Sequence, residues 1–334
     1  MNYTLCQTVQ FLFSLQMITS ILGSVFFYII QKIRYKYKYS LPTRFHCILL
    51  KSAMTFFLIP NTAIILYLFY SMYLSKYSFQ KNICWPNPRY SIFIFQCFAL
   101  TAFMIGSLKK TAGYIKLTMQ LKQYCTSASY QTTNPVIIEP AVHIHKRYGI
   151  RRTLPIHIHP YIPSPSISGI LYPKILLPEH IALQASQETL QIILSHEMLH
   201  HKKKDIFWYY ISAAMQCIYW YLPSVKILCT ELKSWLEYEC DEYCCKENKK
   251  HYSKQDYFNT ILELLCSDKY SRNYILGINF YKNKHQVEER ILYMRAKKDT
   301  QEKRTIFCLL ILLALLSAYL FSLVLSLTIS LQLI

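Results

Sequence analysis

Residues Ser195 to Asp205 read SHEMLHHKKKD, and positions 196–200 of this stretch form an HExxH motif. Residues four apart lie on one face of a helix, so His196 and His200 can present two imidazole nitrogens to one metal ion. Glu197 lies one step round the helix, close enough to hold a water on that ion. Zinc chemistry needs this set, because neutral imidazoles bind the ion and a carboxylate takes the proton of the water. The alternative is a solvated His-rich turn, since another histidine and three lysines follow at once.

The residues before the motif predict a helix that leads into it. Ser186 is suited to an N-cap, and Glu188 would lie in the first turn. Leu190, Ile193 and Leu194 form an apolar stripe that continues to the motif. The pattern is typical of a helix that carries its functional residues into the interior of a domain.

A third metal ligand is available downstream, where residues 235–241 read WLEYECD. Glu237 could complete a His/His/Glu set. Asp241, four residues on, could accept a hydrogen bond from the far nitrogen of a ligand histidine and orient its ring. The alternative is an acidic, exposed helix face, to which Glu239 and Glu242 would also belong. Spacing alone leaves both interpretations open.

Composition indicates a membrane protein. The 334 residues are 53% hydrophobic and carry a formal net charge of +19. An ordinary soluble domain is less apolar, and here the apolar residues come in blocks flanked by Lys and Arg, as in membrane anchors. A basic face suits anionic lipid. The sequence contains no nucleic-acid-binding motif, so we expect a lipid bilayer and no direct contact with nucleic acid.

The 12 cysteines are scattered along the chain. Cys240, Cys244 and Cys245 cluster beside the candidate site and could be drawn as a second metal site. The chain has no Cys-x-x-Cys pair, which favours free cytosolic thiols instead.

Four apolar segments are long enough to cross a membrane: residues 5–30, 47–74, 90–108 and 305–327. Positive charge follows the first and third segments and precedes the last, which places these ends at the inner face. Both termini are then outside. Residues 206–225 are also apolar and aromatic, but a full crossing there would separate Glu237 from His196 by the bilayer. We therefore expect 206–225 to be a helix packed in the core or lying at the inner membrane face.

The chain accordingly divides into three parts. Residues 1–110 hold three transmembrane helices, 111–304 form a cytosolic domain, and 305–334 hold the fourth transmembrane helix and a short outer tail. Within the cytosolic part, residues 155–159 and 170–177 read as short strands joined by a turn-rich connection. The predicted fold is an α-helical membrane protein with about four transmembrane helices and an α+β cytosolic domain that carries the metal site.

Several segments together resemble the BlaR/MecR-type antirepressor membrane metallopeptidases: HEMLHHKKKD at 196–205, IYWYLPSV at 218–225, EYECD at 237–241 and SPSISGILYPKILLP at 164–178. The order of three spans, a cytosolic zinc domain and a fourth span matches as well. The resemblance implies one zinc ion per chain, with His196, His200 and Glu237 as ligands. It implies Glu197 as the catalytic acid/base and Asp241 as the hydrogen-bond partner of a ligand.

The resemblance also implies a function. We expect an integral plasma-membrane zinc endopeptidase that acts in signal transduction and the regulation of antibiotic resistance, cleaving itself, a BlaI/MecI-like winged-helix repressor, or both. A homodimer is a possible assembly. An extended substrate could pair with the predicted strand by β-augmentation, through residues Ile170, Leu171, Lys174, Ile175 and Leu176.

One departure and two alternatives follow. Family members that sense β-lactams carry an outer penicillin-binding domain after the last span, and the sequence ends at Ile334 without one. We therefore do not expect covalent β-lactam sensing by this chain. The first alternative is a membrane-protein quality-control protease similar to the HtpX and prenyl-protein peptidase group, which the ExxCD context suits less well. The second is a non-enzymatic membrane receptor with a structural metal site.

Overall fold

The computed structural model describes residues 3–58, 90–127, 129–162, 164–249, 251–266 and 284–296. These residues fall into two compact units. Within the described residues, the chain passes from one unit to the other at residues 110/111, 215/216 and 232/233. All residues of the predicted metal site belong to the second unit.

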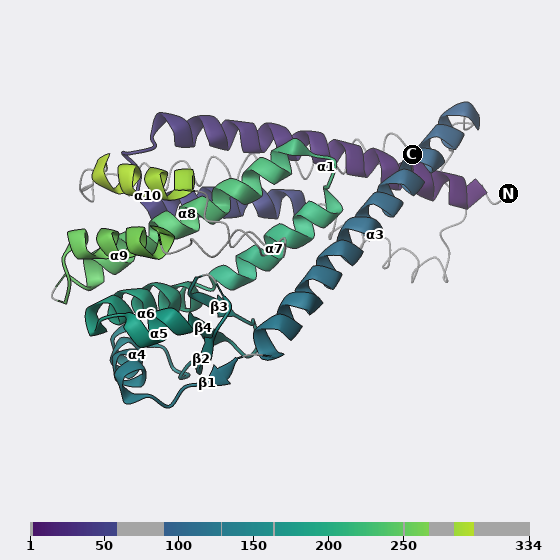
Figure 1. Ribbon diagram of the computed structural model, residues 1–334. Helices are drawn as coiled ribbons and strands as arrows, with labels where there is room; N and C mark the ends of the chain where they lie inside the picture. The colour runs from purple at the N-terminus through teal and green to yellow at the C-terminus, as the bar shows by residue number, and fades with distance from the viewer. Residues whose placement is uncertain are drawn as a thin grey trace. The chain divides into compact units, whose positions relative to one another are not determined.

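The first unit is built from long helices, drawn in Figure 1: α1 (Tyr3–Lys36), a helix at residues 43–58 and the first part of α3 (Tyr90–Ser127). Gly23 lets α1 approach its neighbour, because a Cβ atom there would meet the Phe57 ring at 2.4 Å. Phe26 stacks on Phe56 with ring centroids 4.3 Å apart. The core of this unit therefore lies between α1 and the helix at 43–58.

The predicted spans at 5–30 and 90–108 fall on α1 and α3, so the helical part of this prediction is confirmed. Within the part of the chain that the structure describes, no helix is both long enough and apolar enough to cross a membrane. The predicted span at 47–74 lies only partly within the described residues, and the one at 305–327 lies outside them. The four membrane crossings stay predictions.

The second unit contains a small mixed sheet with strand order β1-β2-β4-β3. Its strands are β1 (Tyr130–Gln131), β2 (Ile156–His159), β3 (Ser166–Ser168) and β4 (Lys174–Pro178). β2 runs parallel to β4, whereas β1 and β3 are antiparallel to the strands beside them. β4 is buried from Ile175 to Pro178, as expected of a strand with neighbours on both sides.

The predicted strand at 155–159 is confirmed as β2, but the predicted strand at 170–177 is too long. β4 begins only at Lys174, and residues 169–173 connect it to β3. Gly169 adopts a φ of +93°, and a Cβ atom there would meet the Tyr172 carbonyl oxygen at 2.5 Å. Only glycine adopts this backbone conformation readily, so the chain turns here instead of continuing as a strand.

The helices of the second unit, or those that enter it, are α4 (Pro135–Tyr148), α5 (Glu179–Gln184), α6 (Gln187–Lys202), α7 (Asp205–Ile218), α8 (Pro223–Glu247), α9 (Lys254–Cys266) and α10 (Lys284–Ala296). α6 packs against α4, β3 and α9, and α9 packs in turn against α10. Figure 1 shows α4, α5 and α6 beside the sheet. Contacts on several sides make α6 the central helix of the unit.

The predicted start of α6 is confirmed. The Ser186 side-chain oxygen accepts a hydrogen bond from the Thr189 backbone N–H at 3.1 Å, and Glu188 lies in the first turn. Leu190 and Leu194 are fully buried. This buried stripe carries the end of α6, and with it the HExxH motif, into the interior.

Residues 206–225 are helical as expected, but they are two helices and not one. α7 ends at Ile218, and α8 begins at Pro223 after a turn. Proline suits a first helical position because the N–H that it lacks would have no partner within the helix. Ile206 and Ser212 of α7 are buried, whereas Phe207 is half exposed.

Candidate metal centre

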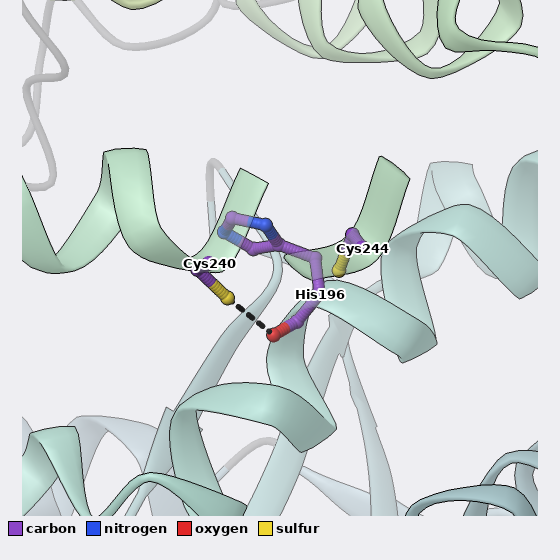
Figure 2. A group of neighbouring side chains, drawn as sticks. All are labelled: His196, Cys240 and Cys244. Atoms are coloured by element: carbon purple, nitrogen blue, oxygen red, sulfur yellow. Dashed lines mark hydrogen bonds between the residues drawn. The ribbon is translucent and has the colours of Figure 1, made fainter. Parts of the chain in front are cut away.

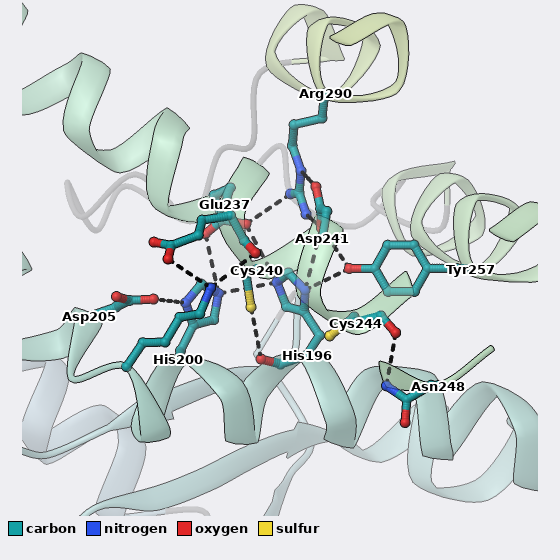
Figure 3. Close-up of polar contacts among 12 residues, drawn as sticks. His196, His200, Asp205, Glu237, Cys240, Asp241, Cys244, Asn248, Tyr257 and Arg290 are labelled. Atoms are coloured by element: carbon teal, nitrogen blue, oxygen red, sulfur yellow. Dashed lines mark hydrogen bonds and ion pairs between the residues drawn. The ribbon is translucent and has the colours of Figure 1, made fainter. Parts of the chain in front are cut away.

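α6 brings the HExxH residues together in a buried position, as Figure 3 shows for the two histidines. His196, Glu197 and His200 are 3%, 8% and 5% exposed. The two Nε2 atoms, His196 Nε2 and His200 Nε2, face each other at 3.2 Å. The solvated His-rich turn is therefore wrong, and the histidines of the motif point into the domain.

α8 contributes Glu237 to the same place. Its Oε2 lies 3.5 Å from His196 Nε2, and its Oε1 lies 3.5 Å from His200 Nε2. The hydroxyl of Tyr209 on α7 donates a hydrogen bond to Oε1 at 3.4 Å. Glu237 is thus directed at the two histidines and not outward on an acidic helix face. The ligand atoms of His196, His200 and Glu237 all lie within 4.8 Å of one another.

These separations fit a tetrahedral zinc ion. Two nitrogens bound at about 2.0–2.1 Å to one such ion lie about 3.3 Å apart, and a carboxylate oxygen lies at a similar distance from each. The Nε2–Nε2 distance of 3.2 Å and the Nε2–oxygen distances of 3.5 Å are close to these values. Two imidazoles and one carboxylate are one of the donor sets found in catalytic zinc sites, with one position left for water.

In both histidine rings, Nδ1 contacts a neighbouring side chain. Nε2 of each ring is therefore available to bind a metal. His200 Nδ1 lies 2.8 Å from Asp205 Oδ2, and His196 Nδ1 lies 2.8 Å from the Tyr257 hydroxyl. When each Nδ1–H donates outward, each Nε2 keeps its lone pair and directs it inward. Two lone pairs facing each other at this distance repel unless a cation lies between them.

Asp241 supports His196 indirectly. Its Oδ1 lies 3.5 Å from His196 Nδ1, and the Tyr257 hydroxyl bridges the two atoms from one side, 2.8 Å from Nδ1 and donating to Oδ1 at 2.6 Å. The prediction of a direct hydrogen bond between Asp241 and a ligand histidine therefore needs a correction. At 3.5 Å this contact is long for a hydrogen bond, and the hydroxyl of Tyr257 on α9 supplies the shorter connection.

Arg290 on α10 closes the network on its other side. Its Nε and Nη2 donate to Asp241 Oδ2 and Oδ1 at 2.8 and 2.6 Å, and its Nη1 lies 2.9 Å from Glu237 Oε2. Figure 3 shows the guanidinium reaching both carboxylates from α10. Burial alone would raise the pKa of Asp241, but Arg290 outweighs burial and lowers it. Asp241 is therefore ionised at neutral pH.

The electrostatic environment of His196 favours positive charge. Burial lowers the pKa of this ring, but the side chains around it, the Glu237 carboxylate among them, outweigh burial and raise it to about 10. The same balance raises the pKa of His200 above its ordinary value. Bound zinc would supply the positive charge that these surroundings stabilise, in place of protons on the rings.

Two cysteines offer a different set of ligands around the same histidine. Ligand atoms of His196, Cys240 and Cys244 also lie within 4.8 Å of one another, as drawn in Figure 2. The Cys240 thiol, however, donates to the His196 backbone oxygen at 3.4 Å. Burial raises the pKa of Cys240, so the thiol stays protonated at neutral pH, whereas a zinc ligand must be a thiolate. The geometry favours the His/His/Glu set.

Asp205, Tyr209, Tyr257 and Arg290 were not among the predicted site residues. Asp205 lies only five residues after His200, so its closeness to the motif could have suggested it as a site residue. Tyr257 and Arg290 lie 61 and 94 positions after His196, and no local pattern marks them. Only the packing of α9 and α10 brings them to the site.

The predicted substrate strand is also corrected. β4 pairs with β2 on one edge and with β3 on the other, so Ile175 and Leu176 have no free edge to offer. Ile170 and Leu171 lie in the connection before β4, where they are 47% and 80% exposed. The outer strand on the α6 side of the sheet is β3, which packs against α6.

We expect Asp241→Asn to weaken zinc binding or activity about 10–100-fold, because it loosens the partner of a ligand histidine. Tyr257→Phe removes the hydroxyl between Asp241 and His196 and should act in the same direction. Glu242→Gln, next to Asp241 on α8 and in an ion pair with the exposed Lys246, is the matched control. Zinc affinity is measured by chelator competition. Equal affinity in all four proteins would show that the contact through Tyr257 does not support the site.

Comparisons with known proteins agree with this geometry. Residues 91–294, more than half of the chain, match the family described as BlaR1 peptidase M56. The chain is 29% identical over 134 residues to "Regulatory protein BlaR1" of Bacillus licheniformis, covering 40% of this chain and 22% of that protein. It is 24% identical over 233 residues to "Methicillin resistance mecR1 protein" of Staphylococcus aureus (strain Mu50 / ATCC 700699) and of Staphylococcus epidermidis, covering 66% of this chain and 39% of each relative.

The chain thus spans less than half the length of these curated relatives. The family resemblance seen in the sequence is nevertheless confirmed, because the matched region contains α4 to α9, most of α10 and every residue of the metal centre. The chain belongs to the BlaR1 peptidase M56 family.

Proposed function

We propose that this protein is an integral membrane zinc endopeptidase that acts in signal transduction, with its catalytic unit on the cytoplasmic face of the plasma membrane. The observation that carries the proposal is the convergence of His196, His200 and Glu237, with Glu197 beside them on α6. This is the arrangement of a hydrolytic site and not of a closed structural one, because three protein ligands leave one position open.

The residues of the site divide the work of peptide hydrolysis. His196, His200 and Glu237 would hold the zinc ion, which when bound acts as a Lewis acid toward water and the scissile carbonyl. Glu197 accepts a proton from the attacking water and delivers it to the leaving amine. Asp205 and Tyr257 keep the histidine rings turned inward through their Nδ1 atoms. Burial of His196, Glu197 and His200 limits competing water.

An extended peptide would bind along β3. Ser166–Ser168 forms an outer strand of the sheet, and β3 packs against α6, which carries the motif. Backbone pairing with a strand holds a peptide with little demand on its sequence. The substrate that we propose is this protein itself, a BlaI/MecI-like winged-helix repressor, or both.

A regulatory role is supported by the relatives. One is named a regulatory protein and the others methicillin resistance proteins, which favours regulated cleavage over membrane-protein quality control. Cleavage of a repressor in the cytosol would relieve repression of the genes that it controls. The same site is consistent with a regulator of antibiotic resistance, whatever signal reaches it.

Reversible removal of the metal tests the proposal. Membranes that contain the full chain and a co-expressed repressor of this class should produce cleavage fragments of the repressor or of the chain. A zinc chelator should stop fragment formation, and added zinc should restore it. Fragments that form at the same rate with and without chelator would show that the cleavage does not depend on this centre. Absence of fragments in zinc-replete membranes would oppose the peptidase proposal itself.

A further inference from the structure

Arg290 is a buried arginine beside the metal centre, with 3% of its surface exposed. It lies on α10, whereas the predicted ligands lie on α6 and α8. It makes a two-pronged contact with Asp241 and an ion pair with Glu237. A guanidinium is costly to bury, and its cost is offset only when its donors meet well-placed acceptors.

The placement of the two carboxylates explains why one side chain can reach both. Glu237 and Asp241 lie four apart on α8 and therefore on the same face of the helix. The planar fork of arginine holds Asp241 through Nε and Nη2 while Nη1 reaches Glu237 Oε2. A lysine ammonium is a single point charge and cannot span both carboxylates in this way.

Arg290 acts on the metal ligands by two routes. It directly contacts Glu237 Oε2, the oxygen that faces His196 Nε2, and so limits rotation of that carboxylate. It also fixes Asp241, which receives the Tyr257 hydroxyl that contacts His196 Nδ1. Removal of this one side chain would loosen two of the three ligands.

We propose that Arg290 is a positioning residue of the metal centre, so that the centre is complete only when α10 is docked on α8. The inference rests on the proposed function, because it assigns a role at the same site. Arg290 does not touch the reacting atoms. It sets the orientation of Glu237 and, through Asp241 and Tyr257, that of the His196 ring.

The test compares three variants of the full chain in detergent: Arg290→Lys, Arg290→Met and Arg295→Met. Arg295 is an exposed arginine on the same helix and is the matched control. Zinc affinity is measured by chelator competition, and the absorption spectrum of the cobalt-substituted protein reports the geometry of the ligands. A role in positioning predicts about 10–100-fold weaker zinc binding and an altered cobalt spectrum in both Arg290 variants. Arg295→Met should match the parent in both measurements.

Arg290→Lys separates geometry from charge, because it keeps the charge and loses the fork. Parent-like affinity and spectrum in Arg290→Lys would overturn the inference, as would failure of both Arg290 variants to fold, since Arg290 would then be a general stabiliser. A different result would contradict the proposed function: the parent protein itself would bind no zinc, or would cleave nothing when loaded with zinc.

Discussion

Glu197→Gln is expected to keep the fold and the metal but to lose proteolysis. The amide is nearly isosteric with the carboxylate, so the packing around this buried residue should survive. It cannot accept a proton from water, and loss of a general base costs about 10²–10⁴-fold in rate. His196, His200 and Glu237 are unchanged, so zinc content should stay at the parent value. The measurement is the rate at which cleavage fragments appear in membranes.

Glu188→Gln is the matched control for this change. It makes the same substitution on the same helix, at an exposed position in the first turn of α6. It should cleave at the parent rate. If Glu197→Gln also cleaves at that rate, Glu197 is not the acid/base. The alternative of a non-enzymatic membrane receptor with a structural metal site would then be favoured.

The sequence predicted the parts of this site that depend on local spacing. His196, Glu197 and His200 belong to one helix, and a motif read on a helix needs only the four-residue repeat to place its ligands. Ser186 and the buried stripe before the motif were predictable for the same reason. Glu237 required the family resemblance as well, because spacing cannot tell a helix face that meets a metal from one that meets water.

The parts that could not be predicted depend on contacts between distant segments. Tyr257 and Arg290 reach the site only because α9 packs against α6 and α10 packs against α9. A tyrosine and an arginine are common on helices, and neither spacing nor charge pattern marks these two. The direct bond predicted for Asp241 was wrong for that reason, since the intervening hydroxyl belongs to another helix.

The order of the strands in the sheet was the other feature that the sequence could not predict. Residues 170–177 are apolar enough to read as one strand, and alternation cannot show which strands flank it. β3 supplies the missing neighbour from only three residues, Ser166–Ser168, in a segment that reads as turn-rich. A strand so short gives little signal, yet it decides which edge of the sheet is open to a peptide.

Loss of both motif histidines should remove the metal. The parent is expected to retain about one zinc per chain after dialysis, as a three-ligand catalytic site implies. His196→Ala with His200→Ala leaves Glu237 as the only member of the set, and one carboxylate does not hold zinc against dialysis. Zinc content should therefore fall to near zero, as measured by elemental analysis of the purified protein.

Single variants then distinguish the two ligand sets, because His196 belongs to both of them. His200→Ala breaks only the His/His/Glu set, whereas Cys240→Ser with Cys244→Ser breaks only the set with the thiols. The geometry predicts that His200→Ala loses zinc and that the double serine variant keeps it. The opposite result would place the ion on Cys240 and Cys244.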